Sequence, residues 1–314
     1  MDVVFSGYKD SDRKELLKLW ERALPLDAVT VDTLETRVLL DENFDPSTFL
    51  IARSDGRMVG FVVGTYARRA AMGDHDPRGD RSWITAFGID PEADLELVGA
   101  PLLEELLSRF RRFGKKECWI STYPTGYFTP GLDIRAYDHL IEFFLTHGFK
   151  KHREALSMDA PIALFEVPAR VKETEEHLRG EGIEIRPYRR DDLLVFLDFL
   201  EQTMPLDWVR VERTNLKKIA TAGFRPDQIT LVLDNGMVVG YCQFEGSHFG
   251  PFGVAEKYQG RGIGTVLLAR TLERMRQQGH HDAWVLWTDD TAAKVYSKFG
   301  FAETRRFAIL MKDL

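Results

Sequence analysis

The chain has 314 residues, 44% hydrophobic and 29% charged, a composition typical of a folded globular protein rather than a disordered or fibrous one. Its length predicts about two domains. Its 42 basic and 49 acidic side chains give a formal net charge of −7, so the basic surface typical of nucleic-acid-binding proteins is not expected, and neither is a nucleic-acid partner.

The chain begins without the basic and apolar segments of a secretory leader, and no run approaches the ~20 apolar residues of a membrane span. Two cysteines, Cys118 and Cys242, are too few for a disulfide framework and too far apart for a metal motif. We therefore expect a soluble cytoplasmic protein, monomeric or homodimeric, with no membrane partner and no metal.

The sequence contains an internal repeat. Pro25-Leu26-Asp27 recurs 180 residues later as Pro205-Leu206-Asp207, and the same offset aligns Gly60 with Gly240. Further along, the offset between matching segments shrinks twice, which predicts two loop insertions in the first copy. One is the polar segment 67–81. The other is the aromatic segment 122–135, for which the two interpretations are an ordinary packed loop and a wall of the acceptor cleft.

The repeat predicts two copies of one α/β domain. The first copy spans 1–157, the linker 158–182, and the second copy 183–314. The charged segment 170–181 within the linker is predicted to be helical. Strands that alternate with helices indicate a mixed sheet covered by helices in each copy.

The second copy has the clearer pattern of elements. Its strands are predicted at 183–188, 228–234, 237–244, up to Val254, 283–287 and 301–311. Its helices are predicted at 190–203, 211–222, 262–278 and 290–299. Asp234-Asn235-Gly236 indicates a hairpin turn between two of these strands, and Gly279 is typical of the residue that ends a helix.

The most informative segment is Gln259-Gly260-Arg261-Gly262-Ile263-Gly264, between a strand that ends at Val254 and an amphipathic helix. Glycines let the backbone approach a ligand closely, and a helix N-terminus offers unpaired N–H groups to a phosphate. Position 265 is threonine, so the dinucleotide-binding spacing is not met. The Gly-Lys-Ser/Thr of a Walker loop is also absent. The remaining interpretations are a pyrophosphate-binding loop and a glycine turn that only starts the helix.

This loop resembles motif A of the GNAT superfamily of acetyl-CoA-dependent acyltransferases, Gln/Arg-x-x-Gly-x-Gly/Ala. The later run from Ala292 to Phe301 is similar to motif B of that family, in which a tyrosine, here Tyr296, precedes Gly-Phe by four residues. The resemblance covers 183–314 directly and 1–157 mainly through the repeat. It implies two tandem GNAT-like domains, each with a mixed, largely antiparallel central sheet flanked by helices.

The resemblance also implies a site for acetyl-CoA as co-substrate. The residues it assigns to coenzyme A binding are Phe252, Gly253, Val254, Gln259, Gly260, Arg261, Gly262, Ile263, Gly264 and Thr265. Tyr296 would protonate the departing thiolate, since a phenol with an ordinary pKa near 10 keeps its proton at neutral pH. The alternative for Tyr296 is a packing role.

An attacking amine must be neutral, so a base or a water relay is required. Glu245 and His248 are the candidates, and a solvated loop position is the alternative for each. One residue departs from the family pattern: Asp289 stands where an asparagine commonly contacts pantetheine. His280-His281 is not expected to bind a metal, because adjacent strand side chains point to opposite faces.

The first copy lacks the parts of this site. At the loop position it has Glu92, Asp94 and Glu96 in place of glycines, and Pro101 removes a backbone donor. Phe144 stands at the tyrosine position and has no proton to give. We therefore expect a degenerate first domain that neither binds coenzyme A productively nor catalyses.

The sequence thus predicts an N-acetyltransferase that moves acetyl directly to a primary amine of a small molecule, with catalysis in the second domain. The acceptor stays open among small amines, amino sugars, amino acids and antibiotics. The alternatives are a non-catalytic acyl-CoA-binding or regulatory protein, and an acyl or aminoacyl transferase with a different donor.

Overall fold

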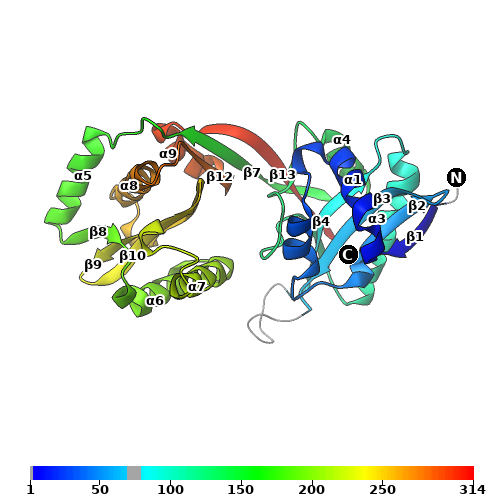
Figure 1. The fold of residues 1–314 in the computed structure, drawn as a ribbon, viewed down its shortest axis with the longest axis horizontal. Helices are drawn as coiled ribbons and strands as arrows, with labels where there is room; N and C mark the ends of the chain where they lie inside the picture. The colour runs from blue at the N-terminus through cyan, green and yellow to red at the C-terminus, as the bar shows by residue number, and fades with distance from the viewer. Residues whose placement is uncertain (1–2, 69–78) are drawn as a thin grey trace. The chain divides into compact units, whose positions relative to one another are not determined.

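The computed structural model describes residues 3–68 and 79–314, so most of the predicted insertion at 67–81 lies outside the described residues. Contacts divide the chain into two compact units (Figure 1). Unit 1 comprises Met1–Ala155 and Arg306–Leu314, and unit 2 comprises Leu156–Arg305. No helix within the described ranges has the length and apolar character needed to cross a membrane.

The sheet of unit 1 is antiparallel except for one parallel pair. Its strands follow the order β1 (Val3–Gly7), β2 (Phe49–Ser54), β3 (Arg57–Tyr66), β4 (Arg81–Ile89) and β5 (Glu117–Ile120). β4 and β5 are the parallel pair. The last strand of the chain, β13 (Ala302–Asp313), completes this sheet, where it pairs antiparallel with β5 and with the short strand β6 (Leu132–Asp133).

Two helices cover opposite faces of the unit 1 sheet. On one face, α1 (Arg13–Ala23) stacks Trp20 on Phe61 of β3 at 4.7 Å between ring centroids. On the other face, α3 (Leu95–Arg112) packs so closely that a Cβ on Gly60 would lie 3.1 Å from Val98. The remaining helices of the unit are α2 (Val31–Leu34) and α4 (Asp138–Thr146).

The sheet of unit 2 has the same plan. Its strands follow the order β7 (Lys150–Pro161), β12 (Asp282–Thr288), β11 (His248–Val254), β10 (Met237–Glu245), β9 (Ile229–Asp234) and β8 (Ile183–Pro187). β11 and β12 are parallel, and the other neighbours are antiparallel. The mixed, largely antiparallel sheet predicted for each copy is thus confirmed.

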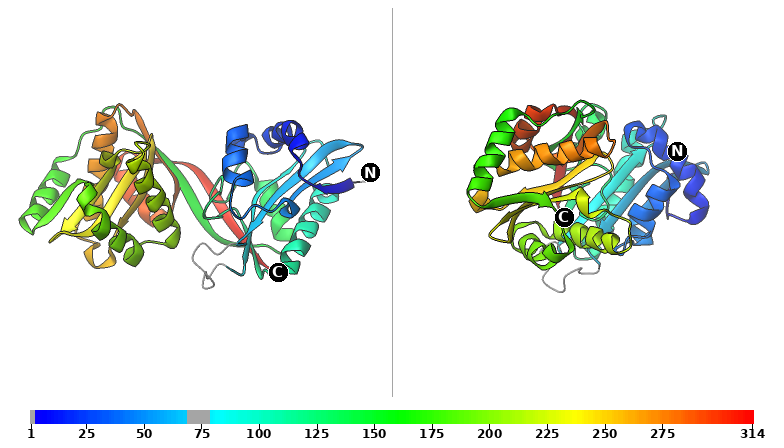
Figure 2. Two further views of the ribbon diagram at one scale, coloured as in Figure 1. Left: turned by 60° about the horizontal axis from the view of Figure 1, so that its bottom comes forward. Right: turned by 60° about the vertical axis from the view of Figure 1, so that its left-hand side comes forward.

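The unit 2 sheet is covered on both faces (Figures 1 and 2). α8 (Ile263–Gln277) lies on one face, and α6 (Leu193–Thr203) and α7 (Leu206–Ala220) lie on the other. Because strand side chains alternate between faces, Cys242 belongs to the core beneath α8, and its neighbour Tyr241 belongs to the core beneath α6. The short helix α9 (Asp290–Tyr296) follows β12.

The units do not follow the boundaries expected from the sequence. The expected linker, 158–182, is part of unit 2. It contains the end of β7 and the helix α5 (Ala169–Gly180), whose Val171 and Leu178 are buried in the core beneath α8. Conversely, Arg306–Leu314 lies in unit 1, although the repeat assigned it to the second copy.

Candidate active site

The strand β11 has one free edge. Among the described residues, its ladder with β12 contains a single pair, His248 with Trp284. Toward Val254 the strand becomes half-exposed. Unpaired backbone N–H and C=O groups at such an edge accept an extended ligand as they would accept another strand.

The glycine loop stands at the end of this edge. Gly260 and Gly262 have φ angles of 78° and 86°, a left-handed conformation that side chains disfavour. Gly262 is the N-cap of α8 and, like any glycine, supplies no capping side chain. The first N–H groups of α8 are therefore left for a ligand, and the positive end of the helix dipole favours an anion there.

Contacts hold this loop in place. Gln259 donates from Nε2 to the Val254 carbonyl oxygen at 3.1 Å, which joins the loop to the end of β11. Arg261 forms an ion pair with Glu181 at 2.5 Å. A Cβ on Gly262 would lie 2.7 Å from Thr174 of α5, and one on Gly264 would lie 3.2 Å from the Phe252 ring. Ile263 is buried and Thr265 half-buried.

Tyr296, at the end of α9, is 6% exposed and lies among the rings of Phe249, Phe252 and Phe301. Burial raises the pKa of its hydroxyl well above the ordinary value, and the neighbouring Cys242 acts in the same direction. Tyr296 therefore keeps its proton throughout the neutral range. Its ring is 6.4 Å from that of Phe252, so the structure brings the predicted proton donor next to the free strand edge.

Glu245 and His248 are register partners across the β10–β11 hairpin, at the opposite end of β11 from the glycine loop. Glu245 is exposed, with Oε1 3.4 Å from Nζ of Lys218. The His248 ring is 4.4 Å from the Trp284 ring. The two candidate bases are thus close to each other but distant from Val254 along the strand.

Asp289 has a local role. It is the N-cap of α9, where its Oδ1 accepts hydrogen bonds from the N–H groups of Thr291 and Ala292, each at 2.8 Å. In the part of the chain that the structure describes, no three His, Cys, Asp or Glu residues gather as a metal site would require.

The corresponding loop of unit 1 is built differently. Asp94 is the N-cap of α3, and its Oδ1 accepts hydrogen bonds from the N–H groups of Glu96 and Leu97 at 2.9 Å. A carboxylate thus occupies the donors that α8 leaves open. Phe144 is fully buried against Phe87. Pro101 was expected at the loop but lies inside α3, so its missing N–H is not among the free donors of the helix N-terminus.

Residues 226–303 match the family model described as an acetyltransferase (GNAT) domain. They include β9 to α9 and therefore the whole glycine loop. Unit 2 therefore contains a GNAT domain. No curated protein matches the chain.

Solved structures show the GNAT fold twice along this chain. The GCN5-related glucosamine N-acetyltransferase region of a fungal multi-domain GH3 β-N-acetylglucosaminidase aligns with a TM-score of 0.81 at 17% identity over 99% of this chain, which spans only 38% of that one. A GCN5-related N-acetyltransferase from Sphaerobacter thermophilus gives 0.69 at 14% identity, over 99% of this chain and 95% of that one. A tandem GNAT protein from the clavulanic acid biosynthesis pathway gives 0.62 at 14%, over 99% and 98%. At these identities the likeness concerns the fold.

Sequence reasoning missed one group of residues on the α7 face of the sheet: Glu212, Tyr241 and Gln243, all of them buried. The repeat contained a signal for two of them. The alignment of Gly60 with Gly240 sets Tyr241 and Gln243 opposite Phe61 and Val63, so a polar residue replaces an apolar one twice in a buried strand. Glu212 gave no such signal, because a glutamate in a helix is ordinarily a surface residue.

Proposed function

We propose that the protein is an acetyl-CoA-dependent N-acetyltransferase whose catalytic site is in unit 2. The observation that carries the proposal is the combination of an uncapped, glycine-built helix N-terminus with a free strand edge and a buried tyrosine. An anion-binding end, a strand-like channel and a proton donor are the parts that thioester aminolysis needs.

In this proposal the pyrophosphate of coenzyme A is held by the backbone N–H groups from Gln259 to Thr265. The absence of side chains at Gly260 and Gly262 leaves room for the phosphate oxygens. The pantetheine arm lies along the free edge at Phe252 and Val254, where it takes the place of a neighbouring strand. Together these contacts direct the thioester toward Tyr296.

The reaction is direct transfer. The amine nitrogen forms a bond to the thioester carbonyl carbon, and a backbone N–H near Val254 stabilises the oxyanion of the tetrahedral intermediate. The C–S bond then breaks with its electron pair on sulfur, and Tyr296 protonates that sulfur. Glu245 and His248 are proposed to take the proton of the amine through water.

The acceptor is proposed to be a small-molecule primary amine. Glucosamine is the first compound to test, because the fungal neighbour is named for it. A suitable panel is glucosamine, putrescine, glycine and tyramine, each given to the full-length protein with acetyl-CoA while free thiol is measured. Release above the amine-free rate is expected with at least one amine. No release from any of them, combined with no thermal shift by acetyl-CoA, would contradict the proposal.

A further inference from the structure

Glu212 of α7 is a fully buried carboxyl group without a hydrogen bond. It is 0% exposed, and neither carboxylate oxygen has a hydrogen-bond partner among the described residues. Burial raises its pKa to about 8, and the nearby Tyr241 hydroxyl opposes that shift without making a hydrogen bond of ordinary geometry. Native proteins seldom leave such a group unsatisfied, because its desolvation is costly.

Two neighbouring polar atoms on the same face are also unsatisfied. They are the Tyr241 hydroxyl and Oε1 of Gln243, both in β10 and both buried. The carboxylate and amide oxygens only accept hydrogen bonds, and the hydroxyl does both. With the Glu212 carboxyl ionised, as a bound cation would favour, these groups form an acceptor-rich cluster with one negative charge, which is complementary to a cation that carries several N–H donors. A primary ammonium group, with three, fits this description.

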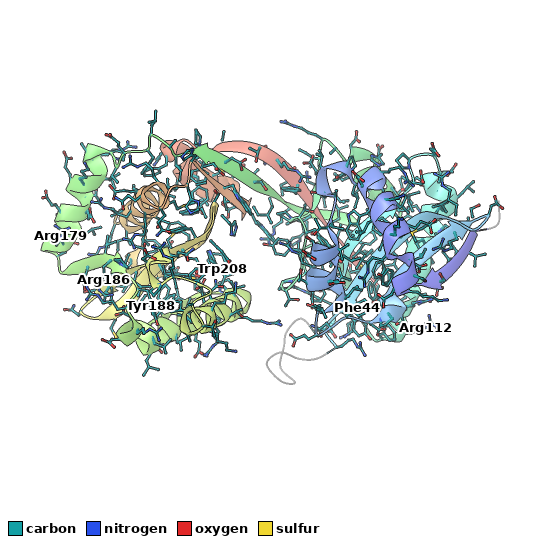
Figure 3. The ribbon with its side chains drawn as sticks, viewed as in Figure 1. Phe44, Arg112, Arg179, Arg186, Tyr188 and Trp208 are labelled. Atoms are coloured by element: carbon teal, nitrogen blue, oxygen red, sulfur yellow. The ribbon has the colours of Figure 1, made fainter. Side chains whose placement is uncertain are left out.

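The cluster adjoins the strand edge proposed for pantetheine. Tyr241 is the register partner of Gly253 in β11. A Cβ on Gly253 would lie 2.6 Å from Met204 and 3.8 Å from Trp208, which α7 carries (Figure 3). Trp208 and Glu212 are four residues apart and so share one face of α7. An amine held at Glu212 would therefore lie across β11 from the acyl donor.

The register of β10 and β11 shows where Gln243, the third residue of the cluster, lies. It shifts between Cys242 and Phe244, so that Gln243 lies opposite the irregular stretch of β11 containing Gly250 and Pro251. β-Bulges of this kind redirect side chains and are frequent beside active sites. The position of Gln243 thus extends the cluster toward the segment where β11 is no longer paired with β12.

The chain contains its own comparison. In unit 1, Phe61 and Val63 occupy the positions of Tyr241 and Gln243, and both are buried apolar residues. The unit without the glycine loop has apolar residues at both of these positions, and its sheet is as complete as that of unit 2. The fold therefore does not require the polar cluster, which occurs only in the unit that carries the other parts of the site.

We propose that Glu212, Tyr241 and Gln243 form the subsite for the acceptor ammonium and that the Glu212 carboxylate takes one of its protons. This inference rests on the proposed function and replaces Glu245 and His248 as the first proton acceptor. Of the described titratable groups, Tyr241 faces Glu212 from the same side of β10, and Cys242 interacts with it electrostatically from the opposite side of the strand.

The proton balance of the step is simple. R–NH3⁺ and the Glu212 carboxylate give R–NH2 and the Glu212 carboxylic acid. The neutral nitrogen forms the N–C bond and the C–S bond breaks. Tyr296 gives its proton to the sulfur, the second proton of the nitrogen passes through water to the Tyr296 oxygen and restores the phenol, and the proton on Glu212 returns to solvent.

The subsite also selects among acceptors. A carboxylate on the carbon that bears the amine would lie beside the Glu212 carboxylate in a water-poor site, where like charges repel strongly. We expect amino sugars and simple amines to react well and α-amino acids poorly. Glucosamine should therefore be a better acceptor than glycine.

The test compares Glu212→Gln with Glu201→Gln, which removes the same charge from an exposed residue of α6. kcat/KM for glucosamine is measured with the full chain from pH 6 to 9. Glu212→Gln should lower it roughly 10²- to 10⁴-fold, the range typical for the loss of an acid–base group, and should remove one ionisation from the profile. Glu201→Gln should match the wild type, and Tyr241→Phe, which recreates the residue of unit 1, should have an intermediate effect.

A second measurement needs no turnover. Methylammonium and tetramethylammonium carry the same charge, but only the first has N–H donors. With coenzyme A present and at equal ionic strength, methylammonium should raise the melting temperature of the wild type more than tetramethylammonium does, and Glu212→Gln should abolish this difference. Equal shifts by the two cations in the wild type would overturn the subsite even if the protein acetylates amines.

The two proposals fail in distinguishable ways. A wild-type protein that acetylates glucosamine while Glu212→Gln behaves like Glu201→Gln contradicts only the Glu212 inference. Absence of both acetyl-CoA binding and thiol release in the wild type contradicts the proposed function.

Discussion

The two units differ at the N-termini of two corresponding helices, α3 in unit 1 and α8 in unit 2. In unit 1 the Asp94 carboxylate fills the donors at the start of α3, and in unit 2 Gly262 leaves those of α8 open. Both helices pack on sheets of the same plan. The fold therefore forms with either a capped or an uncapped helix at this position. Unit 2 lacks the stabilisation of a capping side chain, but the free N–H groups of α8 can bind an anion.

The strongest test of this difference between α3 and α8 is the number of acetyl-CoA molecules that one chain binds. If only α8 offers free donors, the full chain should bind one acetyl-CoA in titration calorimetry. Charge-assisted hydrogen bonds contribute about 1.5–3 kcal/mol each, so losing two or three should weaken binding at unit 1 by two or more powers of ten. A second site of similar affinity would show that unit 1 holds the ligand through other groups.

Gly260→Glu should remove the site of unit 2. Gly260 and Gly236 have φ angles of 78° and 79°, and both have open space around a built Cβ. Glutamate is therefore equally strained at each, which makes Gly236→Glu a matched control. We expect Gly260→Glu to weaken acetyl-CoA binding at least roughly 100-fold by steric exclusion and repulsion of the pyrophosphate. Equal affinities of the two variants in calorimetry would mean that the loop is not the anion site.

Tyr296→Phe makes unit 2 resemble unit 1, where Phe144 holds the equivalent place. Loss of the proton donor should lower kcat roughly 10- to 1000-fold with acetyl-CoA affinity unchanged. Thiol release at saturating acetyl-CoA measures the first quantity, and calorimetry measures the second. Wild-type turnover would assign Tyr296 to packing among Phe249, Phe252 and Phe301.

The Glu212 carboxyl gives a pH-dependent prediction. Its folded-state pKa of about 8 exceeds the unfolded value of 4.5, so between these values the native state binds more protons than the unfolded state. The free energy of unfolding of unit 2 should therefore fall as pH rises through this window, by up to about 1.4 kcal/mol per pH unit. Glu212→Gln should remove this slope. Hydrogen exchange of β10 amides from pH 5.5 to 8, compared between the two proteins, measures it, and parallel profiles would contradict the prediction.

Asp94→Ala should have the smallest effect. It removes a cap from α3 and should cost about 1 kcal/mol in the local stability of that helix, read from hydrogen exchange of the Glu96 and Leu97 amides. Asp289→Ala, which uncaps α9 through the same pair of bonds, is the matched change in unit 2. Uncapping α3 should not create acetyl-CoA binding in unit 1, because no glycine turn precedes the helix. A second acetyl-CoA binding site in titration calorimetry of Asp94→Ala would contradict this expectation.

The sequence predicted most of unit 2 because its signals are local. The Asn235-Gly236 turn, Gly279 after α8 and the glycine loop before it all set backbone conformation within a few residues, and the elements lie where expected. The partner of a strand is not encoded locally. The apolar run of β13 had no feature to show that its end pairs with β5. The position of Pro101 was missed because the N-terminus of α3 starts earlier than the loop match suggested.

The end of β13 belongs to unit 1 although it follows unit 2 in the chain, and this order affects how unit 1 folds. The edge of β5 is covered by Met311–Asp313, which follow the whole of unit 2 in the chain. During translation, the edge of β5 therefore stays unpaired until unit 2 has also been synthesised. Cutting the gene between the two units would leave that edge unpaired permanently, whereas β12 would keep its β7 partners, which belong to unit 2. Exposed edges of this kind pair with other chains and aggregate, so unit 1 expressed without residues 306–314 is expected to aggregate.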